Sequence, residues 1–220
     1  SYRREFQIKK LRPDITCKII RGNVDTRIKK LKEGSYDAII LSYAGIKSLK
    51  MDKEISQIFS VSEIIPSAGQ GIIALQCRKQ DTKIISILNK INHEETFQRA
   101  QAERNILKVL EGDCETAVGA HAIIKDDQIV LEAELFSLDG KKNFYEKKSM
   151  KIKNSKELGK EVGMTLPVRD GDGNLSFQTT PTSLSDVAKN AAEPIIQKRY
   201  EDALNVDIFS KLNEIRNKSR

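Results

Sequence analysis

Residues 118–136 read VGAHAIIKDDQIVLEAELF, and this stretch decides the fold of the C-terminal half of the chain. Two apolar, β-branched segments flank the pair Asp126-Asp127, and acidic residues of this kind favour tight turns. The pattern predicts an antiparallel hairpin whose strands are Val118–Lys125 and Gln128–Phe136. A third strand is expected around Phe144–Ile152, after the turn at Asp139-Gly140.

Helices are expected on both sides of this hairpin in the sequence. Apolar residues recur at helical intervals within residues 82–91 and 95–111. The residues that carry the second pattern are Phe97, Ala100, Ile106, Leu107 and Leu110. A shorter helix is expected to start at Leu158–Val162. Helices combined with an antiparallel sheet make this half an α+β domain.

The N-terminal half alternates predicted strands and helices instead. A helix over residues 3–12 ends at Pro13. The expected elements that follow are a strand at Ile15–Ile20, a helix at Val24–Glu33 capped by Asn23, a buried parallel strand at Ala38–Leu41 and a helix from Ala44-Gly45. This βαβ order predicts an α/β domain.

Two further segments complete the expected organisation. The turn Gly69-Gln70-Gly71 leads into an apolar strand, Ile72–Arg78. Near the C-terminus, Leu184–Ala203 and Asp207–Arg216 have the spacing of two amphipathic helices.

Composition excludes several classes of protein. Hydrophobic residues make up 39% of the 220 residues and charged residues 31%, and no apolar run approaches the roughly 18 residues that span a bilayer. The three cysteines, Cys17, Cys77 and Cys114, are widely spaced, and there are two histidines. This set supports neither a disulfide framework nor a metal site, so we expect a cytoplasmic protein without a metal.

Positive charge is concentrated at one end of the chain. Residues 1–50 hold 13 lysines and arginines against 5 acidic residues, whereas the whole chain has a net charge of +7. Such a segment suits an anionic partner. Nucleic acid is disfavoured, because the aromatic residues are not interleaved with the basic ones as a base-stacking surface needs. The arginines near turns and helix starts, which suit carboxylate binding, are Arg3, Arg4, Arg21 and Arg27.

A cysteine stands on a glycine-bearing loop between the 95–111 helix and the hairpin. The loop reads LEGDCETAVG over residues 110–119, with Cys114 at its centre. A reachable thiol held between two rigid elements suits a covalent attachment point. The alternative is a buried, inert cysteine.

Taken together, six motifs resemble the porphobilinogen deaminase (hydroxymethylbilane synthase) family. They are Ser1-x-Arg3-Arg4, Arg21-Gly22-Asn23-x-x-Thr26-Arg27, the run from Tyr36 to Ile46, Pro66-x-x-Gly69-Gln70-Gly71, Ala102-Glu103-Arg104, and Leu110-Glu111-Gly112-x-Cys114 with Val118-Gly119. They occur in the family's order within residues 1–140.

The resemblance implies a function and a set of site residues. Cys114 would hold a dipyrromethane cofactor through a thioether and prime the condensation of four porphobilinogen units to hydroxymethylbilane, with loss of ammonia, in tetrapyrrole (heme) biosynthesis. The carboxylates of the cofactor, of porphobilinogen and of the oligopyrrole intermediates would meet Arg3, Arg4, Arg21 and Arg27. Ser1 would donate a hydrogen bond to the cofactor, the Asn23 helix start would add backbone N–H donors, and Gln70 would line the cleft. For Arg21 and Arg27, a surface salt bridge is the alternative.

The resemblance also implies an architecture and a boundary. Residues 1–62 would be part of the family's second, periplasmic-binding-protein-like α/β domain, 63–80 a crossover strand belonging to the first domain, and 81–163 the C-terminal α+β domain that carries the cofactor cysteine. Residues 164–220 would be an unassigned loop and helical tail. The catalytic aspartate of the family would lie in a first domain that this chain lacks. We therefore expect a monomer that is inactive alone and works with a separately encoded first domain; the alternative is a non-catalytic remnant that binds anions.

Three positions depart from the family pattern. Asp113 replaces the glycine before the cysteine, Ala117 replaces a proline, and Ser48 occupies the place of an arginine, next to Lys47. A carboxylate beside the thiol would raise the pKa of the thiol and disfavour the thiolate.

Overall fold

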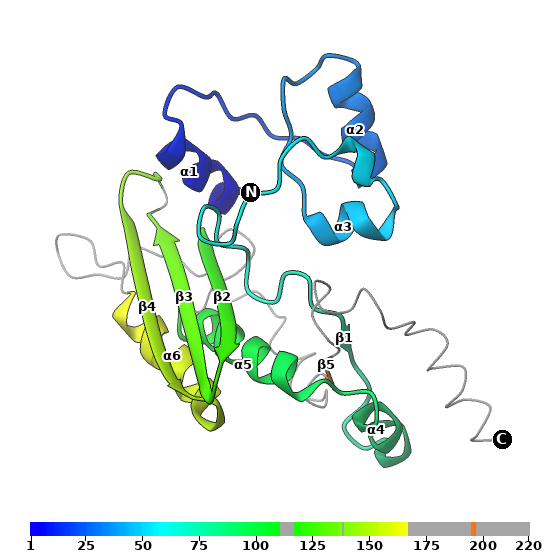
Figure 1. Ribbon diagram of the computed structural model, residues 1–220, viewed down its shortest axis with the longest axis vertical. Coiled ribbons are helices and arrows are strands. Elements are labelled where there is room, and N and C mark those ends of the chain that lie inside the picture. The colour runs from blue at the N-terminus through cyan, green and yellow to red at the C-terminus, as the bar shows by residue number, and fades with distance from the viewer. Residues whose placement is uncertain (111–116, 138, 167–194, 197–220) are drawn as a thin grey trace.

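The predicted three-stranded sheet is at the centre of the C-terminal half (Figure 1). A computed structural model describes residues 1–110, 117–137, 139–166 and 195–196 of the chain. The strands are β2 (Val118–Lys125), β3 (Gln128–Phe136) and β4 (Asn143–Lys151), antiparallel in the order β2-β3-β4. Val118 pairs with Leu135, and Phe136 pairs with Asn143. Both predicted hairpin strands are confirmed with their predicted ends, because the pattern and the turn that specify them are local in sequence.

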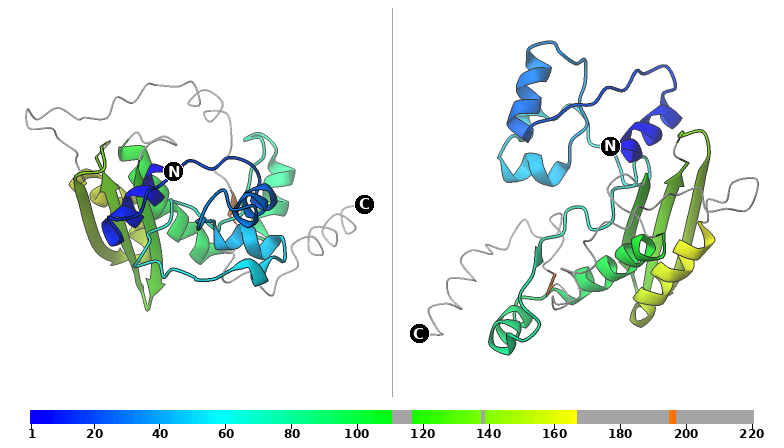
Figure 2. Two further views of the ribbon diagram at one scale, coloured as in Figure 1. Left: turned by 90° about the horizontal axis from the view of Figure 1, so that it is seen from above. Right: turned by 180° about the vertical axis from the view of Figure 1, so that it is seen from behind.

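Two helices cover one face of this sheet (Figures 1 and 2). They are α5 (Glu94–Val109) and α6 (Ser155–Thr165). The short 3-10 helix η2 (Ile152–Asn154) connects β4 to α6. The core between helices and sheet consists of fully buried apolar side chains, including Ile106, Leu131 and Leu158. Gly159 allows α6 to approach α5 closely, because a Cβ there would collide with the backbone carbonyl of Ala102. This packing confirms the predicted α+β character of the segment.

The outer edge of β2 is covered by groups from other elements. The amide of Ala120 donates to the carbonyl of Pro66 at 2.8 Å, and the amide of Ala122 donates to Glu103 at 2.8 Å. The carbonyl of Ala122 accepts from Arg99 Nε, also at 2.8 Å. An exposed strand edge is a site for unwanted pairing, so these contacts satisfy the edge and attach the 64–70 segment to the sheet.

The N-terminal half contains helices but lacks two predicted strands. The helices are α1 (Tyr2–Leu11), α2 (Val24–Lys32), α3 (Tyr43–Ser48) and the 3-10 helix η1 (Asp52–Glu54). The predictions of strands at Ile15–Ile20 and Ala38–Leu41 were wrong, since both segments are irregular. A strand needs a hydrogen-bonding neighbour, and neither segment pairs with any strand among the described residues; Ile19 remains 76% exposed.

The expected strand at Ile72–Arg78 is short and has an unexpected partner. It forms only β1 (Ala74–Leu75), which pairs antiparallel with β5 (Ile195–Ile196). The prediction of a helix over Leu184–Ala203 is therefore wrong at 195–196; the remainder of that range and the predicted Asp207–Arg216 helix lie outside the described residues. Adjacent β-branched isoleucines suit a strand, and β1 offers them unpaired backbone donors and acceptors.

The remaining helix lies beside this strand pair. It is α4 (Thr82–Asn89), whose first turn is capped by Asp81, the carboxylate of which accepts from the amide of Ile84 at 3.1 Å. Its range agrees with the expected helix at 82–91. In the part of the chain that is described, no helix has the length and apolar character needed to cross a bilayer.

Candidate functional site

Arg3 lies at the start of α1 and holds the segment that precedes the Gly-Gln-Gly turn. The residue is 6% exposed, and its guanidinium donates to the carbonyl of Ile65 at 2.6 Å and to Gln70 Oε1 at 3.4 Å. One turn along α1, Gln7 both accepts from the amide of Ile65, at 2.6 Å, and donates to its carbonyl, at 3.0 Å. Arg3 and Gln70, predicted as site residues from distant motifs, are thus in contact.

Three positive charges are brought together around this point. Burial and the nearby positive charge of Arg4 lower the pKa of Arg3 to about 10, so that Arg3 stays protonated at neutral pH. Burial and the charge of Arg27 likewise lower the pKa of Arg4, whose Nη1 donates to the carbonyl of Ile40 at 3.3 Å. Within the described ranges, no carboxylate forms an ion pair with any of these three arginines. The cluster of Arg3, Arg4 and Arg27 is therefore uncompensated positive charge, which suits an anion.

The start of α2 supports one side of this cluster. Gly22 has φ +118°, and a Cβ there would lie 2.9 Å from Thr26 Cγ2, so glycine is needed at this turn. The carbonyl of Gly22 accepts from Arg27 Nε at 2.7 Å, which fixes that guanidinium against the turn. The surface salt bridge considered for Arg27 does not form within the described part of the chain.

Asn23 and Arg21 lie at the same helix start, but their side chains make fewer contacts than the side chain of Arg27. Asn23 is the N-cap of α2, as predicted, but its side chain makes no capping hydrogen bond. Arg21 is exposed, and its carbonyl accepts from Lys30 Nζ at 3.0 Å. No carboxylate pairs with Arg21 among the residues described. The guanidinium of Arg21 therefore has no anionic partner among the described residues. Arg21 lies next to the N-terminus of α2, where the first backbone N–H groups of the helix are open to an anion.

The Gly-Gln-Gly turn is anchored by a residue to which the sequence assigned no role. Gly69 and Gly71 have φ +75° and +80°, which side chains rarely adopt. The amide of Gly69 donates a hydrogen bond to Glu103 Oε2 at 2.8 Å, and the amide of Ala122 donates one to Glu103 Oε1. Glu103 thus connects the turn carrying Gln70 to β2. The only sequence signal was its place in the Ala102-Glu103-Arg104 motif.

Two other predicted site residues are Ser1 and Cys114. Ser1 is exposed and is the N-cap of α1, its carbonyl accepting from the amide of Glu5 at 3.0 Å. Cys114 and its neighbour Asp113 lie outside the described residues. The flanking Ala117 is buried, and its carbonyl accepts from the amide of Phe136 at 3.1 Å. In the described ranges, no group of three His, Cys, Asp or Glu side chains could hold a metal ion.

Comparison with known proteins assigns the family. The family model "Porphobilinogen deaminase, dipyromethane cofactor binding domain" matches residues 1–86, and "Porphobilinogen deaminase, C-terminal domain" matches residues 97–167. The chain belongs to the porphobilinogen deaminase family. These enzymes are transferases, and the first matched region is the family's dipyrromethane-binding domain.

Individual porphobilinogen deaminases show the same relationship. The protein of Coxiella burnetii (strain CbuG_Q212) is 40% identical over 175 residues, covering 80% of this chain and 57% of the relative. The protein of Blochmanniella pennsylvanica is 42% identical over 142 residues, which cover 64% of this chain and 47% of the relative. The protein of Syntrophobacter fumaroxidans is 35% identical over 166 residues, which cover 76% of this chain and 54% of the relative. The chain spans about half the length of the curated relatives it matches.

One departure from the porphobilinogen deaminase pattern has a visible consequence. Ser48, at the place of a family arginine, is exposed and donates to the carbonyl of Gly45 at 2.9 Å. Its neighbour Lys47 is paired with Asp52 at 3.1 Å and lies over the ring of Tyr43. The ion pair with Asp52 raises the pKa of Lys47. Lys47 is therefore already paired, and the positive charge available to an anion comes from the arginine cluster.

Proposed function

We propose that this chain acts as a porphobilinogen deaminase, with a dipyrromethane cofactor on Cys114 and porphobilinogen as its substrate. The reaction would join four porphobilinogen units into hydroxymethylbilane and release ammonia. The observation that carries this proposal is the cluster of Arg3, Arg4 and Arg27, which holds like charges together without a compensating carboxylate among the described residues.

The residues present fit a ligand rich in carboxylates. Folding like charges together is unfavourable, and an anionic ligand that binds between them offsets this repulsion. A dipyrromethane carries two carboxylates on each ring, and each carboxylate can accept paired N–H donors from a guanidinium. When bound, this cofactor supplies the pyrrole carbon to which the first substrate unit is joined.

Each site residue then has a defined task. Arg3 and Arg4 bind and orient cofactor carboxylates, while Arg27 and the α2 amides next to Asn23 receive carboxylates of the substrate. Arg21 adds a further guanidinium at the same helix start. Gln70, held by Arg3, and Ser1 contribute neutral hydrogen bonds. The thiol of Cys114 provides the sulfur of the thioether, which keeps the cofactor attached between additions.

Turnover, we further propose, needs groups outside these 220 residues. Residues 1–62 would be part of the family's second, periplasmic-binding-protein-like α/β domain, 63–80 would cross to the first domain, and 81–163 would be the C-terminal α+β domain. The first domain would supply the aspartate that stabilises positive charge on the reacting ring. The protein would act in the cytoplasm as a monomer. Hydroxymethylbilane formed by the purified chain alone would overturn this part.

The intact mass of the chain tests the cofactor assignment. The full chain is expressed in cells that make porphobilinogen and is measured by mass spectrometry, with peptide mapping of residues 105–125. We expect an added mass equal to a dipyrromethane, located on Cys114. An unmodified Cys114 in folded protein would contradict cofactor attachment and favour an anion-binding module without turnover.

A further inference from the structure

Helix α1 connects the arginine cluster to the C-terminal sheet. Arg3, Gln7 and Lys10 lie on one side of this helix, since they are spaced by four and three residues. Arg3 and Gln7 bind the backbone of Ile65, and Lys10 binds Glu134 of β3. The position of α1 on the sheet therefore sets where the guanidiniums of Arg3 and Arg4 lie.

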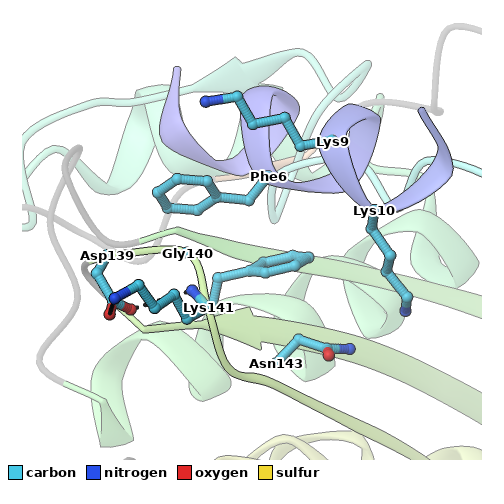
Figure 3. Close-up of a pocket in the computed structure, with 8 residues that line it drawn as sticks. Phe6, Lys9, Lys10, Asp139, Gly140, Lys141 and Asn143 are labelled. Atoms are coloured by element: carbon cyan, nitrogen blue, oxygen red, sulfur yellow. Dashed lines mark hydrogen bonds and ion pairs between the residues drawn. The ribbon is translucent and has the colours of Figure 1, made fainter. Parts of the chain in front are cut away.

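The contact between α1 and the sheet is incompletely packed. The ring of Phe6 lies 5.8 Å from that of Phe136 and against Gly140, where a Cβ would come within 2.5 Å of the Phe6 ring. Beside them is an open hollow of about 270 Å³, lined by α1 and the β3–β4 turn. Figure 3 shows Phe6 and Lys10 on the helix facing Gly140 in the β3–β4 turn and Asn143 at the start of β4. With space left in this contact, the position of α1 depends on its polar contacts, which are made by Arg3, Gln7 and Lys10.

At the far end of α1, the polar contact is made with a buried carboxylate of β3. Glu134 is 4% exposed and accepts from Lys10 Nζ at 2.6 Å and from Asn143 Nδ2 at 2.8 Å. A charged group this deeply buried is costly unless it is paired, so the fold holds Lys10 in this position.

We infer that Glu134 is a positioning residue for carboxylate binding: by holding Lys10, it fixes α1 on the sheet and so sets the geometry of Arg3 and Arg4. This inference rests on the proposed function for the role of the arginines, but the anchoring of α1 does not. A carboxylate bound between guanidiniums needs defined donor positions, so loosening the helix should weaken binding without removing any group that touches the ligand.

The chain provides a matched control two residues away. Glu132 is on the same face of β3, but its carboxylate accepts from Tyr145 Oη at 3.0 Å and lies 3.7 Å from Lys147 Nζ, both on β4. Glu134→Gln and Glu132→Gln thus remove the same charge from the same strand, and only the first change touches α1.

Two measurements on the full chain test the inference. Hydrogen exchange at the Ile65 amide, which donates to Gln7, reports how firmly α1 is held. Titration of the cofactor-free chain with porphobilinogen reports the geometry of Arg3 and Arg4, because without the cofactor these guanidiniums are open to the carboxylates of porphobilinogen. For Glu134→Gln we expect faster Ile65 exchange and about tenfold weaker porphobilinogen binding. Glu132→Gln should change neither, and the charge exchange Lys10→Glu with Glu134→Lys should restore both in part.

The outcomes separate the two proposals. Unchanged Ile65 exchange in Glu134→Gln, or no restoration by the charge exchange, would overturn the anchoring by Glu134. Faster exchange with unchanged porphobilinogen affinity would overturn its link to the arginines. If the unaltered chain does not bind porphobilinogen, the proposed function is wrong, whereas Ile65 exchange still decides whether Glu134 anchors α1.

Discussion

Replacing Cys114 with serine should abolish every covalent pyrrole adduct on this chain. The thiolate of cysteine is the strong nucleophile at neutral pH, whereas a serine hydroxyl needs a neighbouring base to react. Peptide mapping of protein from porphobilinogen-producing cells should then show only the unmodified 105–125 segment. The fraction modified should fall from nearly complete to undetectable.

The other two cysteines are suitable controls for this change. Cys17 and Cys77 are free thiols that are partly exposed, so reagents can reach them. Cys17→Ser and Cys77→Ser should leave the adduct intact. An adduct that persists in Cys114→Ser, or that is lost in either control, would place the attachment site elsewhere.

Replacing Glu103 with alanine should cause a large loss of stability in the C-terminal half. The Glu103 carboxylate is fully buried and accepts the amides of Gly69 and Ala122, both at 2.8 Å. Alanine leaves the buried amide of Ala122 and the partly buried amide of Gly69 without their acceptor, and hydrogen bonds to a charged group contribute about 1.5–3 kcal/mol each. We expect the free energy of unfolding to fall by about 3 kcal/mol or more, as measured by urea denaturation followed by circular dichroism.

An exposed glutamate of the same helix provides the comparison. Glu95 lies in the first turn of α5 on the solvent side, and Glu95→Ala should change the free energy of unfolding by less than about 0.5 kcal/mol. Glu103→Gln retains one acceptor oxygen, so its free energy of unfolding should lie between those of Glu103→Ala and Glu95→Ala. Equal stabilities for Glu103→Ala and Glu95→Ala would show that the bridge between the turn and β2 is not needed.

Elements specified by nearby residues could be predicted from the sequence. The hairpin at 118–136 has its turn and both apolar strands within 19 residues, and it folds as predicted. The helices around it, α5 and α6, carry their own apolar spacing. The α2 start was also predictable, because Gly22 and Asn23 mark it within a few residues.

Features that depend on distant partners could not be predicted in the same way. The apolar segments at 15–20 and 38–41 look like strands, but a strand forms only beside a hydrogen-bonding neighbour. The residues of β1 pair with Ile195 and Ile196, which are 120 and 122 positions away in the sequence. Glu103 bridges two amides that are 34 and 19 positions away from it. The site arginines were identified by family resemblance; their grouping around Arg4 emerges only once α1 and α2 are placed.

The most direct test of the carboxylate site is a porphobilinogen titration of the cofactor-free chain by isothermal calorimetry, because Arg4 and Arg27 are both open to the carboxylates of porphobilinogen in that chain. The unaltered chain is compared with Arg4→Ala, Arg27→Ala and the control Lys29→Ala, an exposed lysine on α2 that lies 3.7 Å from Glu33. A charged hydrogen-bonded contact is worth about 1.5–3 kcal/mol, so each arginine variant should bind at least about tenfold more weakly, and the control should be unchanged. Equal affinity across all four proteins, or no binding by the unaltered chain, would contradict a carboxylate site built from these arginines.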